Sequence, residues 1–249
     1  MRIRVFDLET TGFTPDNHAP CEIGFADLVA LRRDLAGEPC DWRVEEPQSS
    51  LCHPGRPIPA ESSAIHHLVD ADVEGCAPWR EMLPHSLPPK GAEAVAFAAH
   101  NTKFERQWIG VSLTGAAPWI CTYKCALRLW PDAPGHSNQT LRYWLQIDAP
   151  RDIADNAHRA GPDALVTAHI LRRMLETPDV TLKRLIEWSA LPALLVKCHI
   201  NPWRGKRWSE IDDADFLYWI LRRDFSDDVL YTARQRLDAL QTDDDRSAA

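Results

Sequence analysis

The sequence predicts an α/β fold, a mixed sheet flanked by helices. Its first strands, at residues 2–9, about 21–31 and about 48–52, are joined by polar, proline-containing turns, which is typical of an antiparallel meander. A further apolar strand at 94–99 leads into a helix, and a long helix with apolar residues on one face begins at Pro162. A meander followed by a strand and helices indicates the start of a mixed sheet covered by helices.

The remaining helices of this region follow from apolar periodicity and proline. A helix is expected at 60–68, and the four prolines of residues 77–90 predict an interrupted helix-and-loop region. Three further helices are expected at 103–113, 122–130 and 137–146. The predicted buried face of the long helix consists of Ala164, Leu165, Ala168, Leu171 and Leu175. Pro162 suits the first position of that helix.

Beyond Pro178 the pattern changes to that of a smaller module. Its expected elements are a short helix, a basic hairpin or loop with tryptophans and two more helices, at 181–189, 194–208, 212–223 and 226–240. These elements are too few for a large independent core. We therefore expect a main domain at 1–178 and an accessory module at 179–240. The acidic end at 241–249 lacks large apolar side chains to bury, which predicts a disordered tail.

Composition and cysteine usage restrict the class of protein. The 249 residues are 45% hydrophobic and 26% charged, an ordinary soluble composition. No apolar stretch approaches the length of a bilayer span, and the N-terminus lacks the pattern of a secretory signal. Seven scattered cysteines without CxxC pairs indicate reduced thiols in a cytoplasmic protein with no membrane partner. A zinc site at Cys198 and His199 is an alternative for that segment.

Two carboxylates are placed side by side at the end of the first strand. Asp7 and Glu9 are two residues apart, where the apolar strand gives way to a Thr-Thr-Gly turn, so their side chains project from one face. Two like charges this close are costly unless a cation lies between them. Hard cations such as Mg²⁺ and Mn²⁺ prefer oxygen ligands. The pair therefore indicates a divalent-metal site, and a solvated strand end is the structural alternative.

Two later segments carry further reactive groups. Residues 99–105 follow the apolar strand as a polar turn and a helix start, and they include Glu105. Residues 156–164 open the long helix, with Asp163 in its first turn and His158 on the loop before it. Both acids are thus expected at the beginnings of helices that pack on the core.

Taken in order, these segments resemble a known superfamily. The patterns Phe-Asp-x-Glu-Thr-Thr-Gly, His-Asn-x-x-Phe-acid and His-x-Ala-x-x-Asp-Ala look like the motifs of the DEDD exonucleases, in their histidine branch. Stretches similar to the exodeoxyribonuclease X family extend the resemblance to about residue 240, at Arg56–Pro59, Ala64–His67, Trp119–Thr122, Leu127–Pro131, Trp203–Lys206 and Asp215–Ile220. The resemblance implies an RNase H-like fold and metal-dependent hydrolysis of nucleic acid from the 3′ end.

The resemblance also implies a role for each acid and for the histidine. Two ions, Mg²⁺ or Mn²⁺, would bind per active site, with Asp7 bridging both. Glu9 and Asp163 would complete the site of the ion that activates water, and Glu105 would hold the second ion, partly through water. His158 would be the general base, because histidine is the side chain that most often accepts a proton in catalysis.

Glu105 departs from the resemblance, because the superfamily usually has aspartate at this position. The extra methylene extends the carboxylate by on the order of 1.5 Å, which a water-mediated ligand can absorb. A structural alternative is a capping box, with Thr102 at the N-cap of the helix and Glu105 at its third position. Under that alternative the second ion would bind weakly and activity would be low.

Several residues are candidates for contact with the substrate. They are Thr10, Thr11, Gly12, Phe13, His66, Asn101 and Phe104. The resemblance implies that the turn from Thr10 to Gly12 holds the 3′-terminal nucleotide, and glycine permits the close approach of a substrate backbone. Phe13 is expected either to stack on the terminal base or to belong to the core. The last three candidates have structural alternatives: helix packing for His66, a turn position for Asn101 and the core for Phe104.

A basic and aromatic cluster lies in the accessory module. Its members are Lys197, Arg204, Lys206 and Arg207, interleaved with Trp203 and Trp208. Basic side chains contact phosphates and tryptophans stack on bases; the alternative is an exposed hairpin whose tryptophans pack on neighbouring helices. The net charge of −8 is unusual for a nucleic-acid-binding protein, and it predicts weak, salt-sensitive binding.

Together these inferences predict a 3′→5′ exonuclease that binds DNA at a single-stranded or duplex 3′ end and releases nucleoside 5′-monophosphates. The motifs of the C-terminal module favour DNA over RNA. One alternative is an exoribonuclease of the same superfamily. Another is a weakly active nucleic-acid-binding or polymerase-associated subunit, which the departure at Glu105 favours.

Overall fold

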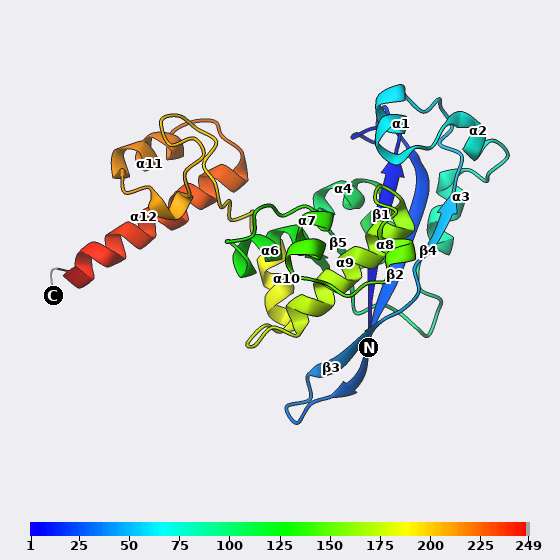
Figure 1. The fold of residues 1–249 in the computed structure, drawn as a ribbon, viewed down its shortest axis with the longest axis horizontal. Helices are drawn as coiled ribbons and strands as arrows, with labels where there is room; N and C mark the ends of the chain where they lie inside the picture. The colour runs from blue at the N-terminus through cyan, green and yellow to red at the C-terminus, as the bar shows by residue number, and fades with distance from the viewer. Residues whose placement is uncertain (248–249) are drawn as a thin grey trace. The chain divides into compact units, whose positions relative to one another are not determined.

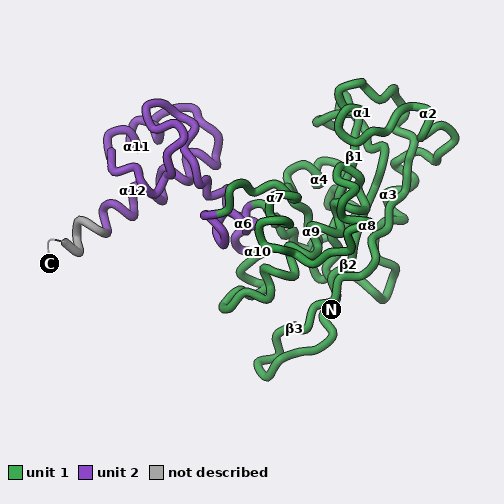
Figure 2. Tube along the Cα trace, in the orientation of Figure 1, with its two compact units in different colours: residues 1–123, 133–186 green, residues 124–132, 187–249 purple. Residues whose placement is uncertain are grey.

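The chain folds into two compact units in a computed structural model that describes residues 1–247 (Figure 2). The N-terminal unit comprises residues 1–123 and 133–186, and the C-terminal unit comprises residues 124–132 and those from 187 on. The boundary at residue 186 lies beyond the one expected at residue 178. The short segment 124–132 groups with the C-terminal unit, a feature for which the sequence offered no signal.

The N-terminal unit is built on a mixed six-stranded sheet (Figure 1). Its strands are β1 (Arg2–Thr10), β2 (Pro20–Arg33), β3 (Pro39–Val44), β4 (Gln48–Leu51), β5 (Ala96–Ala99) and β6 (Trp119–Cys121). Their order is β3-β2-β1-β5-β6, and β4 pairs with the first half of β2. The first four strands pair antiparallel, whereas β5 is parallel to β1 and β6 is parallel to β5. The predicted mixed sheet with an opening meander is confirmed.

Helices connect and cover these strands. Those of the N-terminal unit are α1 (Ala60–His66), α2 (Asp70–Val73), α3 (Trp79–His85), α4 (Thr102–Trp108), α5 (Val111–Thr114), α7 (Asn138–Trp144), α8 (Arg151–Ala154) and α9 (Ala160–Leu175). Two helices carry the chain from one unit into the other, α6 (Thr122–Leu129) and α10 (Leu182–Ala190). The long helix α9 packs on β1 and β2 and is buried along most of its length.

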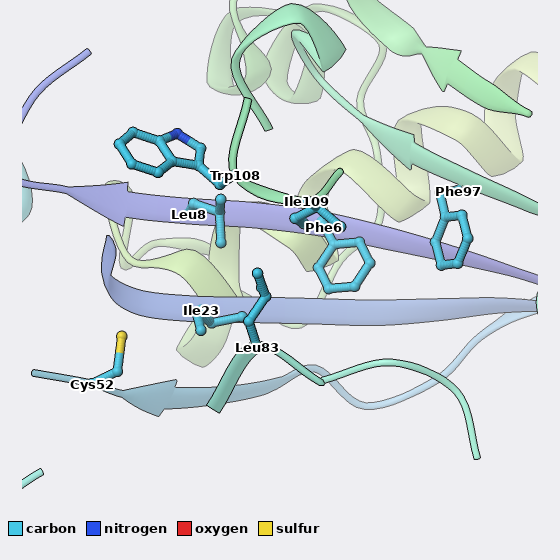
Figure 3. Close-up of a cluster of buried hydrophobic side chains, with 8 residues drawn as sticks. All are labelled: Phe6, Leu8, Ile23, Cys52, Leu83, Phe97, Trp108 and Ile109. Atoms are coloured by element: carbon cyan, nitrogen blue, oxygen red, sulfur yellow. The ribbon is translucent and has the colours of Figure 1, made fainter. Parts of the chain in front are cut away.

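Strand β1 has a different neighbour on each face. Because strand side chains alternate, Phe6 and Leu8 point to one face and Asp7 and Glu9 to the other. The first face carries an apolar cluster of buried side chains (Figure 3), which consists of Phe6, Leu8, Ile23, Cys52, Leu83, Phe97, Trp108 and Ile109. The other face is covered by α9. The two carboxylates are therefore held between the sheet and the long helix.

The start of α9 approaches the sheet closely because residue 24 is glycine. Gly24 on β2 is paired with Asp7 on β1. A Cβ added to Gly24 would lie 2.1 Å from the backbone carbonyl carbon of Ala160, a distance that real side chains do not adopt. The backbone of the first turn of α9 thus occupies the space of a side chain beside Asp7, and this brings the helix within reach of the strand's carboxylates.

The C-terminal unit has a small core of its own. After a 3₁₀ turn, η1 (Trp208–Glu210), come the helices α11 (Ala214–Leu221) and α12 (Asp227–Ser247). The buried cluster consists of Cys198, Trp208, Ile211, Phe216, Leu217, Ile220, Ala233 and Leu237. Trp208 is 3% exposed and Trp203 packs against this cluster. The tryptophans therefore stabilise the module, as the packing alternative predicted, and they do not form an open stacking surface.

Two helices begin or end differently from the sequence-based expectation. The helix expected at 103–113 is divided into α4 and α5, because the backbone leaves helical geometry at Ile109 and Gly110. The helix expected from Pro162 begins two positions earlier at Ala160, so the proline is third rather than first. A proline in the first turn removes no intrahelical hydrogen bond, so all three positions are compatible with it.

The C-terminal end corrects another expectation. Helix α12 continues to Ser247 through most of the segment expected to be a disordered tail, and residues 248–249 lie outside the described range.

The zinc alternative gains no support, because Cys198 is buried with its sulfur 3.4 Å from the backbone nitrogen of Ile200, and burial raises the pKa of its thiol. Within residues 1–247, no helix is long and apolar enough to cross a membrane.

Candidate active site

Three carboxylates from two elements converge where β1 ends. Asp7 and Glu9 extend from the α9 face of β1, and Asp163 lies in the first turn of α9. Each offers an oxygen that lies within 4.8 Å of the oxygens offered by the other two. The strand alternation that placed Asp7 and Glu9 on one face is thus confirmed, and the close start of α9 adds the third acid.

Hydrogen bonds hold Asp163 in this position. The backbone N–H of His158 donates to its Oδ2 at 2.8 Å, and the side-chain amide of Gln139 donates to its Oδ1 at 3.4 Å. The amide of Asn138 donates to the backbone carbonyl of Asp163 at 3.0 Å. Helix α7 and the loop before α9 therefore fix the carboxylate without neutralising it.

Glu105, on α4, lies outside the group of three acids but close enough for its charge to act on Asp7. Its side chain is 4% exposed, and its Oε2 is buried with no hydrogen-bond partner among the described residues. Burial raises the pKa of this carboxyl to about 8, and its charge contributes to raising the pKa of Asp7. A buried acid with an unsatisfied oxygen costs stability unless a cation or proton joins it.

The capping alternative for Glu105 is wrong. Helix α4 begins at Thr102 with Asn101 as its N-cap, and no side chain bonds to the cap. Thr102 is therefore the first helical residue, and Glu105 is one position too far along to close a capping box. The glutamate is free to serve the acidic site.

Crowding makes these acids reluctant to ionise in the metal-free protein. Burial, with the charges of Glu9, Asp163, Glu105 and Glu22 added, raises the pKa of Asp7 well above its ordinary value. Burial, Asp163 and Glu22 raise the pKa of Glu9 to about 8, although Arg159 opposes the shift. An oxygen-rich, crowded and partly unsatisfied site of this kind fits hard divalent cations.

His158 lies on the loop between α8 and α9, with an exposed side chain. Its backbone has φ +59°, the left-handed region, and its N–H is tied to the carboxylate of Asp163. The imidazole is close enough for its charge to lower the pKa of Asp163. The side chain thus stands at the edge of the acidic site, open to water and to a bound substrate.

The turn after β1 is ordered by its own threonines. Thr10 donates from its hydroxyl to the carbonyl of Gly12 at 2.6 Å, and the hydroxyl of Thr11 accepts the N–H of Ala19 at 3.0 Å. Gly12 has φ +152°, and a Cβ there would meet the His18 ring. Phe13 is 75% exposed, so it does not belong to the core, and stacking on substrate stays a prediction.

The other substrate candidates divide between surface and interior. His66 is 2% exposed, and its Nδ1 accepts the N–H of Leu68 at 3.1 Å; burial lowers its pKa, and the packing alternative is favoured. Phe104 is half-buried against Trp108, with ring centroids 6.2 Å apart, as the core alternative requires. Asn101 is exposed and gives no capping bond, so its contact with substrate stays a prediction.

Sequence reasoning missed the residues that hold the acids in place. Glu22 and Gly24 on β2, and Asn138 and Gln139 on α7, all lie beside the cluster. Arg159, which directly follows His158, belongs to the same group because it binds Glu22. The pairing of Glu22 with Glu9 across a predicted meander was the available signal, because two acids opposite each other on a buried face require a partner.

The fold and this site together define a nuclease of a known class. The model of the exonuclease family (RNase T) matches residues 5–171, and the chain belongs to that family. Within it the chain is a DEDD-type 3′→5′ exonuclease of the exodeoxyribonuclease X kind, as the motifs predicted.

Individual relatives agree with this assignment. Exodeoxyribonuclease 10 of Escherichia coli K12 is 29% identical over 221 residues, which cover 88% of this chain and 90% of that protein. A DNA polymerase III subunit epsilon-like protein of Rhodobacter capsulatus is 30% identical over 176 residues, which cover 69% of this chain but 23% of that protein.

Solved structures confirm the RNase H-like fold. Exonuclease X in complex with 5′-overhanging duplex DNA has a TM-score of 0.58 and 26% identity, covering 75% of this chain and 99% of that chain. A 3′-exonuclease that recognises the histone mRNA stem-loop has a TM-score of 0.52 and 14% identity. The match covers 72% of this chain and 84% of that chain. At that identity the likeness concerns the fold alone.

Replacing Glu105 by glutamine is expected to remove a pH-dependent loss of stability from the metal-free protein. Because the folded-state pKa of Glu105 is raised from 4.5 to about 8, this carboxyl lowers the free energy of unfolding as the pH rises between those values. Glu105→Gln should gain about 3 kcal/mol relative to the wild type between roughly pH 5.5 and pH 8. Chemical denaturation with a chelator present measures the gain.

The matched control is Glu81→Gln, an exposed glutamate of α3, which should show the same difference from wild type at both pH values. If the Glu105→Gln difference were also independent of pH, Glu105 would not carry the buried, titrating carboxyl described here.

Proposed function

We propose that this exonuclease hydrolyses DNA from the 3′ end to nucleoside 5′-monophosphates, with two divalent cations, Mg²⁺ or Mn²⁺, in each active site. Asp7, Glu9, Glu105 and Asp163 would hold them, with Asp7 shared. The observation that carries the proposal is the convergence of three carboxylates within 4.8 Å beside a buried glutamate that has an unpartnered oxygen.

The reaction joins a water oxygen to phosphorus and breaks the bond from phosphorus to the 3′ oxygen of the preceding nucleotide. Bound divalent cations supply Lewis acidity for the water, for the phosphate oxygens and for the departing oxygen. His158 would take the proton of the attacking water, since it is exposed at the edge of the site and its backbone is tied to Asp163 at 2.8 Å. Asp163 would orient this loop as well as contribute a ligand.

DNA is the favoured substrate because of the relatives. The similar Escherichia coli protein is named for deoxyribonuclease activity, and the similar exonuclease X structure contains duplex DNA. RNA is the alternative, since the acids and the cations that they would hold act on the phosphodiester, which DNA and RNA share. A non-catalytic role is less well supported, because Glu105 closes no capping box and its buried Oε2 has no hydrogen-bond partner among the described residues.

We also propose that the C-terminal unit contacts the phosphate backbone of the substrate. Its hairpin is closed by pairing of Lys197 with Arg207, and the side chains of Lys197, Arg204 and Lys206 are exposed. Arg207 differs because it forms an ion pair with Asp132 at 2.7 Å. The three exposed cations would add a sequence-independent contact to a protein of net negative charge.

The wild-type protein is expected to shorten a 5′-labelled single-stranded DNA oligonucleotide one nucleotide at a time from its 3′ end. Hydrolysis should require Mg²⁺ or Mn²⁺ and stop with EDTA, and Asp7→Asn should abolish it because a shared ligand is lost. A matched RNA oligonucleotide is the comparison substrate. Hydrolysis of RNA alone would replace DNA in the proposal, and binding without hydrolysis of either would favour the non-catalytic role.

His158→Asn is expected to reduce kcat by about 10²–10⁴-fold, the usual range for loss of a general base. Asparagine tolerates the left-handed backbone of residue 158, and the N–H bond to Asp163 is kept. Mn²⁺ affinity, measured by calorimetry, should therefore remain. His85→Ala, an exposed histidine of α3, serves as control. A large loss of Mn²⁺ affinity in His158→Asn would instead make this histidine a ligand.

Replacing Lys197, Arg204 and Lys206 by alanine is expected to reduce the salt dependence of single-stranded DNA binding. With an inactive Asp7→Asn background, the slope of log K against log[salt] should fall by about 2, since each phosphate contact on a single strand contributes roughly 0.7. The matched variant replaces three exposed arginines of the same unit, Arg222, Arg223 and Arg234. Equal slopes for the two variants would mean that the hairpin makes no specific contribution.

A further inference from the structure

A buried glutamate with no part in the proposed reaction lies beside the acidic site. Glu22 on β2 is 1% exposed and is paired with Glu9 across the β1–β2 ladder. Its carboxylate accepts two hydrogen bonds from the guanidinium of Arg159, each of 2.9 Å, one to each oxygen. A third bond of 3.1 Å comes from the backbone N–H of Ala160. Three donors from one short segment thus meet a single carboxylate of the sheet.

That segment carries the groups of the proposed reaction. Arg159 directly follows His158 and is the N-cap of α9, and Ala160 is the first residue of the helix. The N–H of His158 in turn donates to Asp163. The backbone from His158 to Ala160 is therefore held at both ends by hydrogen bonds, to Glu22 of the sheet and to the carboxylate of Asp163.

Stability alone is a weak reason for such a pair. Removing a carboxylate from water is costly, and well-packed apolar residues in its place are often as stabilising as a buried ion pair. What a bidentate arginine–carboxylate contact adds is a defined direction as well as a distance. The side chain of Arg159 is 40% exposed whereas that of Glu22 is 1% exposed, so the loop is anchored to a fixed point inside the sheet.

We propose that Glu22 and Arg159 are positioning residues, which together hold the His158 loop and the first turn of α9 so that His158 and Asp163 face Asp7 and Glu9. The inference rests on the proposed function for the roles of those four residues. Neither positioning residue touches the substrate. Partners that orient ligating groups in this way typically contribute 10–100-fold to metal affinity or activity.

A purely electrostatic role would have a different signature. The charge of Glu22 raises the pKa of Glu9 and that of Arg159 lowers it. Removing the two charges one at a time would then alter the acidic site in opposite directions. Positioning requires both removals to act in the same direction, because each breaks the same bidentate contact.

The test compares Glu22→Gln, Arg159→Met and the double variant in the full chain. Each single variant should lower kcat on single-stranded DNA by about 10–100-fold and weaken Mn²⁺ binding, measured by calorimetry, in the same direction. The double variant should be no worse than the poorer single variant, since the contact can be lost only once.

The control is another buried ion pair whose acid also lies on β2. Arg4 and Asp27 form a bidentate pair with side chains 5% exposed, and Asp27 lies on the opposite face of β2 from Glu22. Asp27→Asn should lower the melting temperature while kcat and Mn²⁺ affinity, measured well below that temperature, remain at wild-type values.

Three outcomes would each overturn the positioning role. The first is a change of Mn²⁺ affinity in opposite directions in the two single variants, and the second is an additive loss in the double variant. The third is wild-type kcat and Mn²⁺ affinity in a folded Glu22→Gln protein. If the wild type failed to hydrolyse DNA, the proposed function would fall, but the Mn²⁺ affinities of the same variants would still report whether the pair shapes the acidic site.

Discussion

Burial of carboxylates in one shared space, with their mutual repulsion added, is the constraint on which the N-terminal unit depends. Asp7, Glu9 and Asp163 lie within hydrogen-bonding reach of a common centre, and Glu105 adds a fourth acid with an unsatisfied oxygen. Such a cluster opposes folding unless the surrounding structure holds it together. The apolar cluster that contains Phe6 and Leu8 supplies that support, because β1 carries these core residues on one face and the acids on the other.

Beside the acidic site, the sheet and α9 meet through their backbones instead of through packed side chains. The missing side chain of Gly24 admits the first turn of α9, and the Glu22 carboxylate accepts hydrogen bonds from the N–H of Ala160 and from the guanidinium of Arg159. The pairing register also shifts between Glu9 and Thr10, a bulge that ends regular pairing beside the acids. Three successive features of β2 therefore serve the carboxylates of β1.

Local patterns predicted much of this arrangement. Strand alternation was sufficient to place Asp7 and Glu9 on one face, and helical periodicity was sufficient to place Asp163 at the root of a buried helix. The ends of elements were less predictable. The early start of α9 at Ala160 depends on tertiary contacts, since the backbone of Ala160 meets Gly24 and donates to Glu22. The meander could have indicated that Glu22 faces Glu9, but its partner Arg159 could not be assigned from sequence, because that residue lies more than a hundred positions away along the chain.

The acidic site has a consequence for how this protein exchanges protons with its surroundings. With pKa values near 8 for Glu9 and Glu105, the metal-free site holds protons at neutral pH that ordinary carboxyls would have lost. Any divalent cation that binds there must displace them. Binding is thus an exchange of ions rather than a simple addition, and the heat recorded in a titration includes the ionisation of whatever buffer receives the protons. Buffers of different ionisation enthalpy would count the protons released.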